Sequence, residues 1–228
     1  MSVTPHQPMA PRLDDGLGEV TRNLARDFAG TFSPETIDRF VAECHGMVID
    51  LLVPPPTNQP QQSSPRTTAR VAGLTRQFAA ERLQALAQSE GLVAKQVPEV
   101  LFVCVHDGGR SQLAAQLTRH LASGRVNVRS AGSRPASMVH PWVIAVLAEL
   151  GIDASEAYPK PLTDETVRAA DVVVTMGCGD SCPVLPDKHY EDWAVGDPIG
   201  ADIAQTRAVR DDIVGRVQGL LGSLSLQI

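Results

Sequence analysis

Features typical of disulfide-rich, nucleic-acid-binding and strongly aromatic proteins are scarce in this sequence. Its 228 residues include only four cysteines and 4% aromatic residues. Four cysteines are too few for a disulfide scaffold, so in a reducing compartment they are thiols available for chemistry. The 26 acidic residues outnumber the 20 basic ones, giving a net charge of −6. This balance disfavours nucleic acid or an anionic membrane as the main partner.

Long hydrophobic runs are also missing. Apolar runs such as residues 100–105 are far shorter than the roughly 18 residues that a membrane-spanning helix requires. The first residues lack the basic head and apolar core of a secretory signal. We therefore expect a cytoplasmic protein with no membrane partner. The hydrophobic share of 43% is ordinary for a globular chain of one or two domains.

Two segments rich in proline and glutamine divide the first half of the chain. Residues 1–12 are predicted to be a disordered tail and residues 53–65 a loop. Apolar residues recur at helical spacing around that loop, which predicts a three-helix domain within residues 13–92. Ser33 is predicted to cap the second helix, with Pro34 at its first helical position.

From about residue 97, short apolar runs typical of strands alternate with helical segments. Strands are predicted at residues 99–104, 125–130, 171–176 and 188–193. Helices are predicted at residues 111–122, 140–150, 163–170 and 203–221. This order favours an α/β domain over residues 97–228 with a doubly wound parallel sheet, whose functional site lies at the carboxyl ends of the strands.

One loop combines a thiol, two glycines, an arginine and a hydroxyl between the first strand and its helix. Its sequence is Cys104-Val105-His106-Asp107-Gly108-Gly109-Arg110-Ser111. The glycines allow backbone N–H groups to turn inward around an oxyanion, and the helix N-terminus adds partial positive charge. Arg110 is suited to bind two anion oxygens. The positive field favours a Cys104 thiolate, with Ser111 donating to the sulfur. The alternative is a buried thiol followed by an ordinary turn.

Two more cysteines and an acid follow later strands at the same predicted edge of the sheet. Cys178 and Cys182 are separated by three residues on a loop containing glycine, so their thiols can approach one another. A zinc site is the competing interpretation, but no second pair of Cys or His at ligand spacing completes it, so we predict no metal. Asp197, in an Asp-Pro pair, is a candidate to shuttle the proton of an attacked or departing oxygen.

Taken together, these motifs resemble arsenate reductases built on the low-molecular-weight tyrosine phosphatase fold. The resemblance runs from about Val97 to Leu221. It rests on the loop 101–112, Ser130-Ala-Gly132, Pro159-Lys-Pro-Leu162 and the segments 171–183 and 190–198. The predicted N-terminal helical domain, notably residues 32–36 and 78–91, is similar to the three-helix extension of one bacterial subgroup of these reductases.

The resemblance implies arsenic detoxification by a relay of three thiols. Cys104 would attack arsenate held by the amides of residues 105–111 and by Arg110, with Asp197 as proton donor. Cys178 would attack the resulting adduct and release arsenite. Cys182 would then displace Cys104 from the disulfide, leaving a Cys178–Cys182 bond for thioredoxin or a similar dithiol carrier to reduce. No bound cofactor is implied, and phosphate or sulfate should mimic arsenate.

The loop departs from the family pattern at two positions. Asp107 and Gly108 stand where the family usually carries Asn followed by Ala or Ser. A carboxylate at residue 107 would repel a bound dianion unless it is protonated or turned outward, so we expect Asp107 to weaken anion binding. Ala115 replaces the acidic residue of the potassium-binding members, and we predict no potassium site.

Two other functions compete with arsenate reduction. A low-molecular-weight protein tyrosine phosphatase would share Cys104, Arg110 and Asp197 but would hydrolyse its phospho-cysteine with water. The presence of Cys178 and Cys182 argues against a phosphatase. So does the small number of aromatic residues, of which Tyr158 and Trp193 are the candidates, that could surround the ring of a phosphotyrosine substrate. An anion-sensing regulatory protein is disfavoured because residues 1–95 hold nine basic and ten acidic residues, with no basic recognition face.

Overall fold

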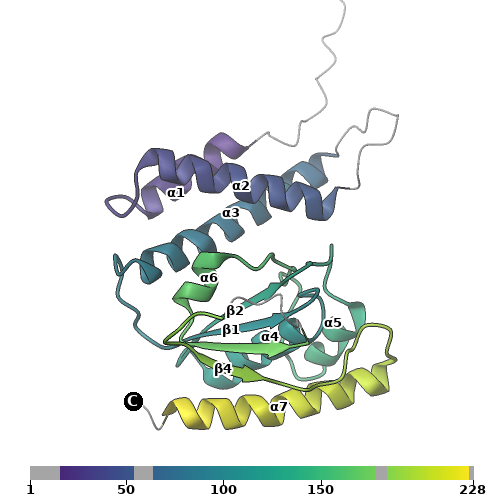
Figure 1. Ribbon diagram of the computed structural model, residues 1–228. Coiled ribbons are helices and arrows are strands. Elements are labelled where there is room, and N and C mark those ends of the chain that lie inside the picture. Colours follow the sequence, from purple (N-terminus) through teal and green to yellow (C-terminus); the bar gives the residue numbers. More distant parts are fainter. Residues whose placement is uncertain (1–15, 54–63, 178–183, 226–228) are drawn as a thin grey trace, which may run out of the picture. The chain divides into compact units, whose positions relative to one another are not determined.

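The computed structural model describes residues 16–53, 64–177 and 184–225, and it divides into two units (Figure 1). One unit ends at Gln84 and the other begins at Ala85. The predicted tail at residues 1–12 and most of the predicted loop at residues 53–65 lie outside the described residues, as do Cys178 and Cys182. The functional division into residues 13–92 and 97–228 stays a prediction.

The three predicted N-terminal helices are present. They are α1 (Leu17–Asp27), α2 (Pro34–Leu52) and α3 (Pro65–Ser89). Ser33 caps α2 as predicted, because its Oγ accepts the N–H of Thr36 at 3.3 Å. The predicted loop extends one residue too far, because Pro65 is already the first residue of α3. Ser64 Oγ accepts the N–H of Thr67 at 3.1 Å and caps the helix there. The division between the two units falls within α3.

The second unit holds a parallel sheet of four strands, ordered β2-β1-β3-β4. The strands are β1 (Glu99–Cys104), β2 (Asn127–Gly132), β3 (Val172–Met176) and β4 (His189–Asp192). The helices are α4 (Arg110–Ala122), α5 (Pro141–Ala148), α6 (Asp164–Ala169) and α7 (Ile203–Ser225). The predicted fold class is confirmed. Strand β2 starts two residues later than predicted, because Arg125 N–H bonds to the carbonyl of Ala122 and closes the turn after α4.

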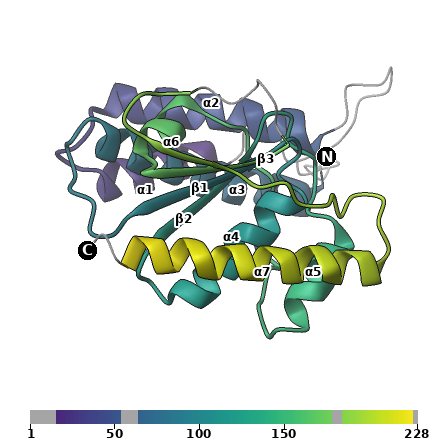
Figure 2. The same cartoon turned by 60° about the horizontal axis from the view of Figure 1, so that its bottom comes forward.

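Helices cover both faces of this sheet, so strand β1 is buried on both sides. Val100, Phe102 and Cys104 pack in a core with residues of α4, α5 and α7, whereas Leu101 and Val103 pack with residues of α6. Figure 1 shows α6 on one side of the sheet and α7 on the other. Figure 2 shows α7, in yellow, running beside α4 and α5. This two-sided burial explains why β1 reads as a continuous apolar run.

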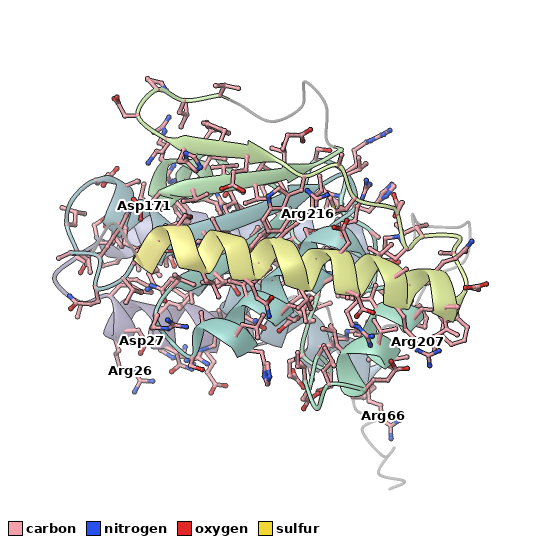
Figure 3. All side chains as sticks on the ribbon, turned by 90° about the horizontal axis from the view of Figure 1, so that it is seen from below. Arg26, Asp27, Arg66, Asp171, Arg207 and Arg216 are labelled. Carbon is pink, nitrogen blue, oxygen red and sulfur yellow. The ribbon has the colours of Figure 1, made fainter. Side chains whose placement is uncertain are left out.

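Helix α7 combines an apolar contact face with ion pairs at the surface. Arg207, labelled in Figure 3, donates from Nη2 to Glu149 Oε1 at 2.6 Å, at the end of α5. Such exposed pairs contribute only about 0–1 kcal/mol. The fully buried Ile213 and Val217 contribute more to the packing of α7. Within the described residues, no helix is both long and apolar enough to cross a membrane.

Candidate active site

The Cys104 loop begins where the strand order of the sheet reverses. Cys104 is the last residue of β1 and pairs with Gly132 of β2 on one side and Met176 of β3 on the other. The chain passes from β1 to β2 and later returns to the opposite side of β1 as β3. Crevices at such a switch point, outside the carboxyl ends of the strands, are the usual ligand sites of α/β sheets.

Hydrogen bonds to the segment after β2 fix the peptide groups of this loop. Four carbonyls of the loop accept amide N–H groups: Cys104 from Ser133 at 3.2 Å, Val105 from Arg134 at 2.8 Å, His106 from Ala136 at 2.8 Å and Gly108 from His140 at 2.8 Å. The carbonyl and the N–H of one peptide group point in opposite directions. The N–H groups of Val105, His106, Asp107 and Gly109 are therefore turned away from that segment, toward the inside of the loop. Asp107 N–H donates to Cys104 Sγ at 3.2 Å.

Two glycines allow neighbouring segments to approach the loop closely. A Cβ atom on Gly132 would lie 2.8 Å from the nitrogen of Asp107 and 2.8 Å from the oxygen of Val105. A Cβ atom on Gly109 would lie 2.8 Å from Cγ of Pro198. The loop therefore lies directly against the end of β2 and against the Asp197-Pro198 turn.

Arg110 and Asp197, both predicted site residues, lie together. Arg110 is the first residue of α4, and its Nη2 donates to Asp197 Oδ2 at 2.7 Å. The buried Nε of Arg110 makes no hydrogen bond within the described part of the chain. A tetrahedral anion inside the loop would supply that acceptor. Asp197 is 41% exposed, and its Oδ1 accepts the N–H of Ile199 at 3.0 Å.

Cys104 and Ser111 face one another beneath the loop. Cys104 is 2% exposed, and its Sγ lies 3.0 Å from Ser111 Oγ. Ser111 is fully buried in the first turn of α4, where helix N–H groups carry partial positive charge. The sulfur is thus surrounded by a hydroxyl, an amide and a helix N-terminus, all of which stabilise negative charge.

Asp107 is completely buried in the left-handed backbone region, with φ at 45°. Its carboxyl group is directed into the interior, where it accepts hydrogen bonds from Ser111 and Gln112 of α4, Ser130 of β2 and the backbone N–H of Lys160. Burial raises the pKa of Asp107 to about 6, although the positive charge of Lys160 and the hydrogen bonds oppose this rise.

The sequence did not identify Gln112, Ser130 or Lys160 as partners of Asp107. The only signal for them was their presence in the motifs that carry the family resemblance. Gly177, which follows β3, was also missed: a Cβ atom there would lie 2.8 Å from Arg110 Nη1. Tyr158 and Trp193, the aromatic candidates, are only 6% and 5% exposed. Within the described residues, no group of three or more His, Cys, Asp or Glu is arranged to hold a metal ion.

The geometry of this loop agrees with the comparison of the sequence with family models. The model described as low molecular weight phosphotyrosine protein phosphatase matches residues 99–227, which begin at β1 and extend past α7. The chain belongs to the low molecular weight phosphotyrosine protein phosphatase family.

Proteins similar in sequence to this chain include several arsenate reductases. A putative arsenate reductase of Halobacterium salinarum is 36% identical over 124 residues, covering 52% of this chain and 87% of its own. A glutaredoxin arsenate reductase of Synechocystis is 35% identical over 130 residues, covering 56% of this chain and 98% of its own. The resemblance drawn from the sequence motifs is confirmed.

A solved structure extends the similarity beyond the phosphatase-like residues. The thioredoxin-dependent arsenate reductase of Corynebacterium glutamicum is 40% identical, with a TM-score of 0.78, and covers 93% of this chain and 97% of its own. Coverage of this extent includes the N-terminal helices, which the family model does not match.

Proposed function

We propose that the protein reduces arsenate to arsenite, with Cys104 as the nucleophile and an external dithiol protein as the final reductant. The observation that carries the proposal is the orientation of the loop peptides, whose N–H groups are turned to the inside of the loop. Asp107 N–H donates to Cys104 Sγ, and the buried Nε of Arg110 makes no hydrogen bond within the described residues. This arrangement suits a tetrahedral oxyanion bound directly over the sulfur. The arsenate reductase names of the similar chains identify which oxyanion to test first.

The proposed reaction transfers two electrons from a pair of thiols to arsenic. Cys104 Sγ attacks arsenic and displaces one oxygen, which leaves as water with a proton from Asp197. Cys178 then attacks Cys104 Sγ, the arsenic–sulfur electron pair stays on arsenic, and arsenite departs. Cys182 next attacks Cys178 and frees Cys104, leaving a Cys178–Cys182 disulfide.

Two contacts of the described residues support a role for the thiols after β3. Met176, the last residue of β3, pairs with Cys104. Gly177 lies against the guanidinium group of Arg110. Cys178 is the next residue in the sequence. Cys178 and Cys182 themselves lie outside the described residues, so their roles belong to the proposal.

Thioredoxin is the proposed reductant, since the similar structure from Corynebacterium is named thioredoxin-dependent. The related Synechocystis protein is named a glutaredoxin arsenate reductase. The two carriers are therefore tested side by side. A cytoplasmic location, which would keep the three thiols reduced between turnovers, stays a prediction.

The function is tested by following NADPH oxidation on addition of arsenate, with thioredoxin and its reductase present. A parallel reaction contains glutaredoxin, glutathione and glutathione reductase, and a third contains an aryl phosphate and no reductant. We expect turnover with arsenate and thioredoxin. Strong hydrolysis of the aryl phosphate without arsenate-dependent oxidation would identify a phosphatase instead.

The three thiols are separated by single-turnover experiments. Cys178→Ser should retain arsenic on Cys104 and release little arsenite. Cys182→Ser should release about one arsenite per enzyme and then stop, with a Cys104–Cys178 disulfide visible by mass spectrometry. Cys44→Ala is the control, because Cys44 is fully buried in α2. Full turnover by Cys182→Ser with thioredoxin as sole reductant would rule out the relay.

A further inference from the structure

A single hydroxyl connects the sulfur of Cys104 to the buried carboxyl group of Asp107. Ser111 Oγ lies 3.0 Å from Cys104 Sγ and 2.7 Å from Asp107 Oδ1. The three residues are 2%, 0% and 0% exposed, in the order Cys104, Ser111 and Asp107, so bulk water does not compete for these contacts. A serine hydroxyl has one hydrogen to donate. When Asp107 is ionised, Ser111 donates to the carboxylate, and the contact with sulfur then requires a thiol hydrogen on Cys104.

The two oxygens of Asp107 have different surroundings. Oδ2 accepts three hydrogen bonds, from Lys160 N–H at 2.9 Å, Gln112 Nε2 at 3.1 Å and Ser130 Oγ at 3.3 Å. Within the described part of the chain, the hydrogen-bond partner of Oδ1 is Ser111. A proton added to the carboxyl group is therefore directed to Oδ1, because the lone pairs of Oδ2 already face donors. From Oδ1 it donates to Ser111 Oγ, which releases the serine hydrogen for the sulfur.

We propose that Asp107 is the internal proton acceptor for Cys104 and acts through Ser111. The inference rests on the proposed function in taking Cys104 as the nucleophile. The thiol hydrogen passes to Ser111 Oγ, and the hydroxyl hydrogen of Ser111 passes to Asp107 Oδ1. The products are a thiolate that accepts a hydrogen bond from Ser111 and a neutral carboxylic acid that donates to Ser111. One proton moves, the total charge is unchanged, and no other reactant takes part.

The surroundings of Asp107 leave both of its protonation states accessible. Burial raises the pKa of Asp107 to about 6, so its carboxylate is a stronger base than that of an exposed aspartate. Among the groups packed on it, α4 and β2 contribute the uncharged Ser111, Gln112 and Ser130, and β1 contributes Cys104. Lys160, in the segment before α6, is the charged side chain that acts on it and favours the ionised form. The carboxyl group is thus neither fixed in its ionised form nor fixed in its neutral form.

The relay also explains how an aspartate is tolerated beside a dianion. In the form with a Cys104 thiolate, Asp107 is protonated and uncharged, so it does not repel bound arsenate. An asparagine at residue 107 would offer its oxygen to the three donors and its NH₂ group to Ser111. Asp107→Asn is therefore a permanent analogue of the protonated form, and it provides a nearly isosteric test.

The test measures the rate at which iodoacetamide alkylates Cys104 as a function of pH, in the full chain kept reduced by a phosphine. The Cys104 peptide is quantified by mass spectrometry, so the other thiols do not contribute. In the unchanged protein we expect thiolate to form in two steps, because two groups share one proton. In Asp107→Asn we expect thiolate to form in one step. The midpoint of that step should lie about one pH unit or more below the midpoint of the upper step in the unchanged protein.

A double-mutant comparison separates a relay from simple charge repulsion. If Asp107 acts through Ser111, Asp107→Asn should shift the midpoint of thiolate formation less than half as far in a Ser111→Ala background as it does when Ser111 is present. An equal shift in both backgrounds, or no shift in either, overturns the proposal. Asp153→Asn, which removes a negative charge from an exposed turn, should leave the profile unchanged. Thermal unfolding of each variant verifies that it is folded.

Infrared spectroscopy provides a second measurement. In the unchanged protein we expect the carbonyl band of a protonated carboxylic acid to persist in part above about pH 6, the value to which burial raises the pKa of Asp107, because the proton shared with Cys104 keeps part of the carboxyl groups neutral. The band should be absent from Asp107→Asn. Complete ionisation of Asp107 at acid pH, while Cys104 remains a thiol, would overturn the relay. Neither measurement uses arsenate. A coupled titration without arsenate reduction would therefore reject the proposed function alone, and turnover with an uncoupled titration would reject the relay alone.

Discussion

A buried carboxylate lies at each end of the parallel sheet, Glu99 at the amino end and Asp107 at the carboxyl end, and the two are stabilised in different ways. At the amino end, Glu99 is fully buried, and its Oε2 accepts a hydrogen bond from Arg129 Nε at 3.0 Å. Its Oε1 accepts from Gln88 Nε2 at 2.7 Å and from Asn127 Nδ2 at 2.9 Å. Arginine keeps its charge at every physiological pH, so the Glu99 site is an ion pair between two buried charges.

At the carboxyl end, Asp107 is equally buried but accepts its hydrogen bonds from two hydroxyls, an amide side chain and a backbone N–H. These donors are uncharged, and the burial of the group raises its pKa to about 6. Under the proposed relay, one fold uses buried carboxylates for two purposes. An arginine partner fixes the charge of Glu99 and contributes to structure, whereas neutral donors leave the proton of Asp107 free to move toward Cys104.

The strongest test of this contrast removes the thiol at the carboxyl end. Cys104→Ser should reduce arsenite formation to the uncatalysed background, because a serine hydroxyl stays protonated in the field that favours a thiolate. Thermal unfolding should change little, since the substitution replaces one atom. Arsenite release is measured in a single turnover with excess enzyme. Release above that of a sample without enzyme would show that Cys104 is not the nucleophile.

A second test removes the negative charge at the amino end of the sheet. Glu99→Gln leaves Arg129 buried without its counter-charge, and we expect this to lower the free energy of unfolding by about 3–5 kcal/mol. Asp212→Asn is the matched control, because it also removes a carboxylate from an arginine, Arg216, but at the surface. That change should cost less than about 1 kcal/mol. Urea unfolding at pH 7 measures both. Equal losses of unfolding free energy in the two variants would show that the buried Glu99–Arg129 pair contributes no more to stability than an exposed pair does.

A third test uses the pH dependence of stability at the carboxyl end. The pKa of Asp107 rises from its ordinary 3.8 to about 6 on folding, so the folded state binds more protons between these values. The stability that this group contributes is therefore complete below pH 3.8 and is lost as the pH rises through about 6. The full loss is about 3 kcal/mol.

Asp107→Asn lacks this titration but keeps all the other ionisable groups. The contributions of those other groups to the pH dependence of the unfolding free energy therefore cancel when the two proteins are compared. Relative to the unchanged protein, the variant should gain up to about 3 kcal/mol of unfolding free energy between pH 4 and pH 7. Urea unfolding at several pH values provides the comparison. A difference between the two proteins that stays constant with pH would contradict the raised pKa.

The contrast between the two ends also separates what the sequence predicts from what it does not. Strand β1 was predicted with correct bounds because burial on both faces makes it a continuous apolar run. The loop of residues 104–111 could be recognised because its cysteine, glycines, arginine and serine are contiguous. The partners of Asp107 were not, since Gln112, Ser130 and Lys160 lie on three separate segments that only the crossover connections bring together.

The smallest expected effect concerns the glycine that lies against Arg110. Gly177 has φ at +71°, and a Cβ atom there would lie 2.8 Å from Arg110 Nη1. Gly151 has φ at +72° with no atom within 4 Å of such a Cβ, so it reproduces the backbone strain without the contact. Alanine at either position should cost about 1–2 kcal/mol of stability.

Only the alanine at residue 177 should affect the site. Arg110 is held by Asp197 on its other side, so a new methyl group displaces the guanidinium from the anion. We expect the KM for arsenate to rise by roughly tenfold or more in Gly177→Ala and to stay unchanged in Gly151→Ala. Steady-state kinetics with thioredoxin, combined with urea unfolding, measure both quantities. Equal KM values in the two variants would show that Arg110 does not set arsenate binding through its position beside Gly177.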